Sequence, residues 1–199
     1  MTAMQEAVRT YLESVESLCP GVTDTELNFL ESRLSVSEYK PRHTYISADN
    51  IQDEIGFVHR GLLRAFFIDS KGNEITVNFI RERGCATHYS AFISRTPSRY
   101  SFMCMEPSVI VSLTYDHIQE AYERYPVMER YGRLMAEQVL KSQQKRIEGF
   151  LFATAESRYL EFVRENPDLF NRVSLSHLAS YLGIERQTLT RIRQRLAGH

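Results

Sequence analysis

The residues best suited to recognition chemistry lie near the C-terminal end of the chain, in a run of arginine, glutamine and threonine. Guanidinium and amide groups hydrogen-bond to base edges, and arginine and threonine also bind phosphate oxygens. From Asn171 to His199 the sequence carries five Arg and one Glu, although the whole chain has a net charge of −1. The candidate DNA-contacting residues are Arg186, Gln187, Thr188, Arg191, Arg193 and Arg195. A nucleic-acid interface confined to this segment is therefore predicted.

The apolar residues around this run predict the two helices that would position it. They recur at helical spacing on both sides of Gly183, as Leu178, Ala179 and Leu182 before it and Ile184, Leu189 and Ile192 after it. A tight turn between crossing helices needs a left-handed backbone, which glycine adopts at the least cost. Residues 174–196 are therefore predicted to form a helix-turn-helix. The alternative is an amphipathic helical hairpin with a solvated basic face.

The composition is that of an ordinary globular protein. The chain has 199 residues, of which 43% are hydrophobic and 25% charged, enough for one large or two small domains. Cys19, Cys85 and Cys104 show no CxxC spacing, which favours reduced thiols in a cytoplasmic protein over a disulfide framework or a zinc site. Neither a signal peptide nor a stretch of membrane-spanning length is recognised, so no membrane partner is expected.

Sequence periodicity predicts helices first and strands in the middle of the chain. Residues 4–18 are amphipathic, and a second helix starts at Thr23, where Glu26 completes a capping box. After about Val36, short β-branched and aromatic segments alternate with turn signals, which predicts a sandwich or barrel of roughly eight strands. The strands recognised are Ile55–His59, Leu62–Ile68, Glu74–Ile80, Tyr100–Met105 and Val109–Thr114.

Helical periodicity returns after the strands. A short helix is predicted from Asp116 to Tyr125, and a long one from Pro126 to about Glu148. The apolar stripe of the long helix is wide, which favours pairing with a second copy over packing on the barrel alone. Gly149–Ala153 is predicted to be a hinge, after which Thr154 caps a further helix.

The order of these elements, two short helices, about eight strands, a long helix and a helix-turn-helix, resembles that of the Crp/Fnr family of transcription regulators. Residues 57–80, FVHRGLLRAFFIDSKGNEITVNFI, are similar to the hairpin region of the family's β-roll, and residues 183–193, GIERQTLTRIR, to its recognition helix. The resemblance implies an α+β fold. Residues 1–125 would form N-terminal helices and a double-stranded, jelly-roll-type β-roll like that of cyclic nucleotide-binding domains. Residues 126–149 would be a dimerisation helix, and residues 150–199 a helix-turn-helix DNA-binding domain.

The resemblance also implies a function. The chain would be a regulator that binds palindromic double-stranded DNA as a homodimer, through the helix Glu185–Leu196, with RNA polymerase as a candidate further partner. Arg186, Thr188 and Arg191 stand where family members contact bases and phosphates. Gln187 stands where the catabolite-activator type has a glutamate. Glutamine would favour adenine, whereas glutamate accepts a hydrogen bond from cytosine. Two features depart from the family pattern: Glu185 replaces the usual serine-type cap, and the β-hairpin wing after the helix is missing.

The effector region departs from the cyclic-nucleotide pattern. Family members that bind cyclic nucleotides hold the ribose with a Gly-Glu pair and the phosphate with an Arg-Ser pair about ten residues later. Counting along this chain puts His88-Tyr89 at the first pair, and Arg99-Tyr100, or alternatively Ser98, at the second. Cyclic AMP is therefore not expected to bind. The residues that could line a pocket for an unknown small anion or aromatic effector are His88, Tyr89, Arg95, Arg99 and Tyr100; otherwise these side chains are solvated or packed.

Other functional classes find less support. The six histidines show no HExxH spacing and an iron–sulfur cluster would need four cysteines, so neither a metal site nor an enzyme is predicted. A redox-responsive thiol at Cys85 or Cys104 is a further alternative, although Cys104 lies in an alternating strand and is expected in the core. The alternative function is a cyclic-nucleotide- or small-ligand-binding interaction module that no longer binds DNA specifically.

Overall fold

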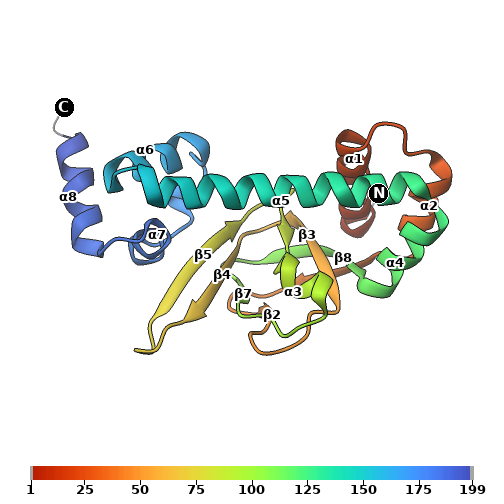
Figure 1. Ribbon diagram of the computed structural model, residues 1–199, viewed down its shortest axis with the longest axis horizontal. Helices are drawn as coiled ribbons and strands as arrows, with labels where there is room; N and C mark the ends of the chain where they lie inside the picture. The colour runs from red at the N-terminus through yellow and green to blue at the C-terminus, as the bar shows by residue number, and fades with distance from the viewer. Residues whose placement is uncertain (1, 198–199) are drawn as a thin grey trace. The chain divides into compact units, whose positions relative to one another are not determined.

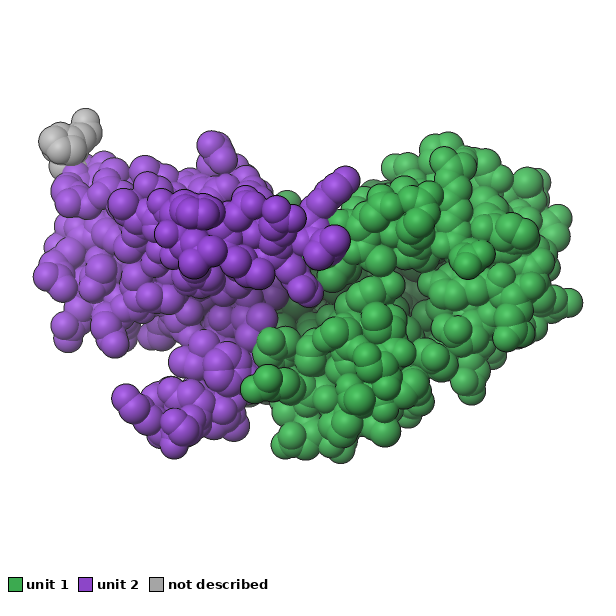
Figure 2. Space-filling view, viewed as in Figure 1, with its two compact units in different colours: residues 1–65, 79–139 green, residues 66–78, 140–199 purple. Residues whose placement is uncertain are grey.

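The computed structural model describes residues 2–197, which divide into two compact units. Figure 2 shows unit 1, Met1–Ala65 with Phe79–Val139, and unit 2, Phe66–Asn78 with Leu140–His199. The elements follow in the order α1 (Ala3–Leu18), α2 (Asp24–Glu31), β1 (Ser35–Tyr39), β2 (Thr44–Ile46), β3 (Glu54–Arg60), β4 (Leu63–Ile68), β5 (Glu74–Ile80), β6 (Cys85–Ala86), α3 (Tyr89–Ser94), β7 (Ser101–Cys104), β8 (Ser108–Thr114), α4 (Tyr115–Arg124), α5 (Pro126–Phe152), α6 (Ala155–Glu165), the 3₁₀ turn η1 (Leu169–Asn171), α7 (Leu175–Leu182) and α8 (Arg186–Ala197).

The strands form two four-stranded sheets, ordered β1-β8-β3-β6 and β2-β7-β4-β5 (Figure 1). Their antiparallel pairing confirms the predicted β-roll and α+β class. Strand β8 is buried along almost its whole length, because α1 and α4 contact it and two strands flank it in its sheet. A strand covered in this way is nearly continuously apolar rather than alternating.

The core of unit 1 lies between the sheet that contains β8 and the helices α1, α2, α4 and the start of α5 (Figure 1). Tyr11 of α1 meets Phe57 of β3 edge to face, with ring centroids 5.4 Å apart. Capping boxes begin both N-terminal helices, and the predicted pair of Thr23 and Glu26 is confirmed. Caps satisfy the free N–H groups of the first helical turn, so the start of each helix is specified locally.

The long helix α5 extends further than the sequence indicated. It runs to Phe152, through most of the segment predicted to be a hinge, and leaves only Ala153 and Thr154 before α6. A single Gly149 weakens a helix by only about 1 kcal/mol, and no proline interrupts it. Phe150 also makes a tertiary contact in unit 2, since the guanidinium group of Arg158 of α6 lies over its ring.

In unit 2, α7 and α8 form a short helix pair. Ser174 caps α7, and Gly183 ends it in the left-handed conformation, with φ of 66°. Five of the six predicted inner residues are buried, namely Leu178, Ala179, Leu182, Leu189 and Ile192. The sixth, Ile184, is half-buried and precedes the start of α8. The hairpin between β4 and β5 also contacts α7 through hydrogen bonds between Thr76, Glu74 and Ser180.

Candidate functional site

Helix α8 has a buried face and a polar face. Leu189 and Ile192 are at most 6% exposed, whereas Arg186, Gln187 and Arg191 are exposed. Thr188 is half-buried. The structure thus presents these three predicted contact residues, and Arg195 as well, to solvent on the same helix.

Two of the predicted contact residues have partners inside unit 2. The Arg193 guanidinium lies 4.7 Å from the centroid of the Phe170 ring, and Arg195 forms an ion pair with Glu156 of α6. A cation above an aromatic ring is held by the ring quadrupole. Both arginines therefore contribute to the placement of α8 as well as to its charge.

Two exposed residues of α8 were missed in the sequence analysis. Thr190 and Gln194 are exposed and follow Gln187 by three and seven residues, a spacing that puts them on its face. Helical periodicity alone could have found them, because neither falls on the buried stripe that contains Leu189 and Ile192.

Two arginines hold the C-terminal end of α7. Arg146 of α5 donates to the carbonyl oxygen of Tyr181 at 2.9 Å, and Arg158 of α6 donates through Nε to that of Leu182 at 3.1 Å. The last carbonyls of a helix have no partner within it and form the negative end of its dipole. These bonds join α7 to both neighbouring helices within the unit.

His88 sits in a small hydrogen-bonded network in unit 1. Its Nδ1 atom lies 3.1 Å from Oγ of the buried Ser98 and accepts the N–H of Arg99 at 3.3 Å. Its ring lies 4.4 Å from that of Tyr100. Partial burial, followed by the charge of Arg99, lowers the pKa of His88.

The remaining predicted effector residues point to different partners. Arg95 pairs with Asp53 at 2.7 Å and donates to the Gln52 carbonyl, while the Arg99 side chain is exposed. Of the five predicted residues, only Tyr89 lines the cavity described next. The structure thus brings His88, Tyr100 and the backbone of Arg99 together, whereas Arg95 binds Asp53 and Gln52.

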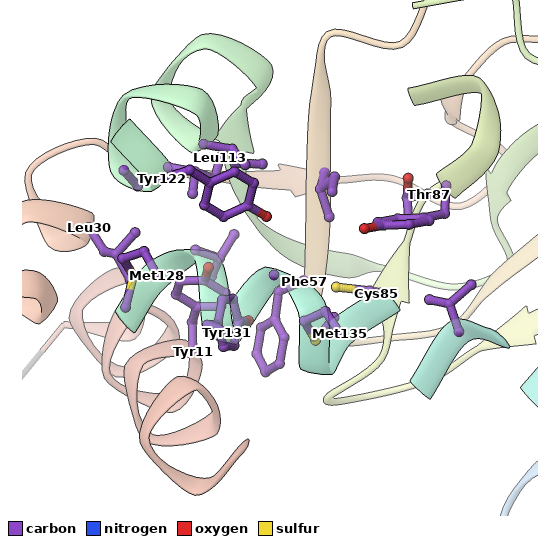
Figure 3. Close-up of a pocket in the computed structure, with 17 residues that line it drawn as sticks. Tyr11, Leu30, Phe57, Cys85, Thr87, Leu113, Tyr122, Met128, Tyr131 and Met135 are labelled. Carbon is purple, nitrogen blue, oxygen red and sulfur yellow. The ribbon is translucent and has the colours of Figure 1, made fainter. Parts of the chain in front are cut away.

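Unit 1 contains an apolar cavity of about 60 Å³ beside α4 and α5 (Figure 3). Its lining residues come from α1 to α5 and from three strands, namely Tyr11, Leu30, Ile55, Phe57, Cys85, Thr87, Tyr89, Val111, Leu113, Ile118, Ala121, Tyr122, Met128, Tyr131, Gly132, Met135 and Val139. Burial raises the pKa values of Tyr122 and Cys85 to about 12, and it also raises those of Tyr11 and Tyr131. These groups are therefore uncharged near neutral pH.

The cavity carried no signal in the sequence, because its residues are scattered from position 11 to position 139 and read one by one as packing. Cys85 lines it, whereas Cys104 is fully buried, as predicted. Within residues 2–197, no three His, Cys, Asp or Glu side chains gather as a metal site would require. None of the helices described there is both long and apolar enough to span a bilayer.

Comparison with known family models finds a match in the middle of the chain. Residues 36–125 match the cyclic nucleotide-binding domain family. Comparison with curated protein sequences finds no significant match.

Solved structures extend the likeness over most of the chain. The fold is similar to that of FixK2 from Bradyrhizobium japonicum, at 15% identity over 83% of this chain and 85% of that one, with a TM-score of 0.70. It is also similar to the c-di-GMP-responsive global regulator CLP of Xanthomonas campestris, at 12% identity over 88% and 92%, with a TM-score of 0.70.

The catabolite activator protein of Thermus thermophilus shares the fold at 16% identity, over 91% of this chain and 86% of that one, with a TM-score of 0.57. Residues 36–125 thus match the cyclic nucleotide-binding domain family, within a chain whose fold is similar to those of FixK2 and the catabolite activator protein.

Proposed function

We propose that the chain is a cytoplasmic, homodimeric transcription regulator that binds palindromic double-stranded DNA through α8, with RNA polymerase as a candidate partner. The observation that carries this proposal is the two-sided character of α8. Leu189 and Ile192 anchor the helix, while Arg186, Gln187 and Arg191 face solvent. An anchored helix with such an outward face has the donors and acceptors that major-groove readout requires.

Separate roles follow for the residues of α8. We assign Arg186 to guanine and Gln187 to adenine, the bases that their side chains match in two-point hydrogen bonding. Thr188 and Arg191 are assigned to phosphate oxygens. Arg193 and Arg195 are assigned to the positioning of α8 and to the local positive field, because each has a partner within unit 2.

The exposed apolar residues of α5 support a homodimer. Leu140, Ile147 and Leu151 are 65%, 58% and 69% exposed, and their spacings of seven and four put them on one stripe. Large apolar side chains gathered on an exposed helix face indicate a partner surface. A second copy of α5 fits, because a two-fold dimer also matches a palindromic site.

We further infer that the roll does not use a cyclic nucleotide as its effector. His88 and Ser98 stand near the positions expected to hold ribose and phosphate, and they hydrogen-bond to one another. The Ser98 hydroxyl is thus engaged with His88 and with the Tyr100 carbonyl oxygen, which leaves it less available to a phosphate. Isothermal titration with cyclic AMP and cyclic GMP tests this inference, and micromolar binding of either nucleotide would contradict it.

The DNA-binding role is tested by selecting sites from a randomised DNA library with the purified protein. Affinity for the enriched site is then measured by fluorescence anisotropy. For Arg186→Ala, the loss of a two-point base contact of about 1–3 kcal/mol predicts roughly 5- to 150-fold weaker binding to that site. Random-sequence DNA should be affected much less.

The matched control is Arg164→Ala, which removes another exposed arginine of unit 2, on α6. It should leave the difference between selected and random DNA intact. Equal losses for Arg186→Ala on both DNAs would contradict base reading. If the library yields no enriched site, the interaction-module function is favoured instead.

A further inference from the structure

The cavity of unit 1 is larger than ordinary packing explains. Protein interiors seldom leave voids larger than one water molecule. This cavity of about 60 Å³ has room for about four to five water-sized groups. It is bounded by residues from the sheet, such as Phe57 and Cys85, and by residues from the helices, such as Met128, Tyr131 and Met135 (Figure 3).

The lining selects against charge. None of the seventeen side chains that border the cavity in the described part of the chain is acidic, basic or a histidine. Its polar groups are the hydroxyls of Tyr11, Tyr89, Tyr122, Tyr131 and Thr87 and the thiol of Cys85. They can form hydrogen bonds but provide no countercharge, and an unpaired ion buried among them would be strongly disfavoured.

We propose that this cavity is a binding site for a small, uncharged and mainly apolar ligand of about four to five non-hydrogen atoms. One hydroxyl-like group on the ligand could bond to a tyrosine. The site differs from the predicted effector cassette, because His88, Arg95, Arg99 and Tyr100 do not line it.

The position of the cavity also connects it to the long helix. Residues of α5 from Met128 to Val139 line it, and Tyr122 of α4 packs directly against Gly132, where an added Cβ would collide with its ring. A guest in the cavity therefore contacts both sides of the α4–α5 junction. An effect of such a ligand on DNA binding would rest on the proposed function, whereas binding of the ligand to the cavity would not.

Methyl NMR of the full chain tests the proposal, with the methionine methyl groups labelled with ¹³C. Met128 and Met135 line the cavity, whereas Met103 and Met105 do not and act as internal controls. The probes are 1-butanol and butyrate, which share a four-carbon chain and differ in charge. We expect saturable shifts at Met128 and Met135 with 1-butanol, small shifts at the control methyls, and no saturable response to butyrate.

A cavity-filling variant localises the response. Val139→Phe should abolish the saturable shift, and Gln138→Phe, at the adjacent exposed position, should preserve it. If Val139→Phe fails to fold, Cys85→Leu fills the cavity from the opposite side and should have the same effect. Shifts of equal size at all four methyls, or an equal response to butyrate, would overturn the proposal.

This readout requires no DNA. A protein that binds 1-butanol but selects no DNA site would refute only the regulator function. A protein that selects a site but shows no saturable methyl shift would refute only the cavity proposal.

Discussion

The backbone N–H of Thr76 in β5 donates a 2.8 Å hydrogen bond to the hydroxyl oxygen of Ser180 in α7. Thr76 is buried, so its N–H has little access to water if that acceptor is removed. Ser180→Ala should therefore lower the free energy of unfolding by about 1–2 kcal/mol, and amide exchange at Thr76 should accelerate. Urea unfolding and hydrogen exchange measure the two effects.

The control for this change is Ser142→Ala, at an exposed position of α5. An exposed serine that becomes alanine should alter stability by no more than about 0.5 kcal/mol. If both variants behave alike, the bond between Thr76 and Ser180 contributes nothing to stability.

Two glycines of unit 2 should respond in opposite directions to alanine. Gly183 has a φ of 66°, and an added Cβ would lie 2.7 Å from a ring carbon of Phe150, so Gly183→Ala should lower stability by about 1–3 kcal/mol. Gly149 lies within α5 with no atom near its added Cβ, so Gly149→Ala should raise stability by about 0.5–1 kcal/mol. Thermal unfolding measures both variants. An unchanged stability for Gly183→Ala would show that alanine is not strained at this position.

The apolar stripe of α5 predicts an effect on assembly. Leu151→Glu places a charge on the proposed dimer face and should convert the dimer to monomer in light scattering after gel filtration. Leu160 of α6 is also an exposed leucine, at 47%, but lies off the stripe, so Leu160→Glu should keep the wild-type mass. A monomeric wild-type protein, or two variants of equal mass, would argue against α5 as the interface.

Arg191 and Arg193 should separate DNA binding from stability. Arg191 is exposed, so Arg191→Ala should weaken DNA binding and leave the unfolding midpoint unchanged. Arg193 lies over Phe170, so Arg193→Ala should lower the free energy of unfolding by about 0.5–1 kcal/mol. Anisotropy and urea unfolding measure both properties, and the assignment fails if Arg193→Ala has wild-type stability.

His88 predicts part of the pH dependence of stability. Burial, and then the charge of Arg99, lowers its pKa below the ordinary value of about 6.5, so the folded state binds the proton less readily than the unfolded state. The stability that this group contributes is fully present above its unfolded-state pKa of about 6.5. It is lost as the pH falls below that value and through the lower pKa of the folded state. Between about pH 7.5 and about pH 5.5, His88→Gln should therefore lose less stability than the wild type; equal losses would refute this role.

Much of the fold was predictable because it depends on signals within a few residues. The capping box at Thr23, the strand Glu74–Ile80 and the left-handed Gly183 all lie where their local sequence indicated. Several short elements were not recognised, namely β1, β2, β6, α3 and η1, since segments of two to six residues show little periodicity. The extra turn of α5 was missed because Gly149 suggested a break that tertiary contacts of Phe150 oppose.

The sequence by itself determined the order of the longer helices and strands, the sandwich or barrel in the middle of the chain and the polar, basic face of α8, because periodicity and turn chemistry act over short distances along the chain. Only the tertiary structure decided which of these polar groups have partners. It pairs Arg195 with Glu156 and His88 with Ser98, and it builds an uncharged cavity from residues as far apart as Tyr11 and Val139. Such contacts depend on how distant segments pack, and no local pattern encodes that packing.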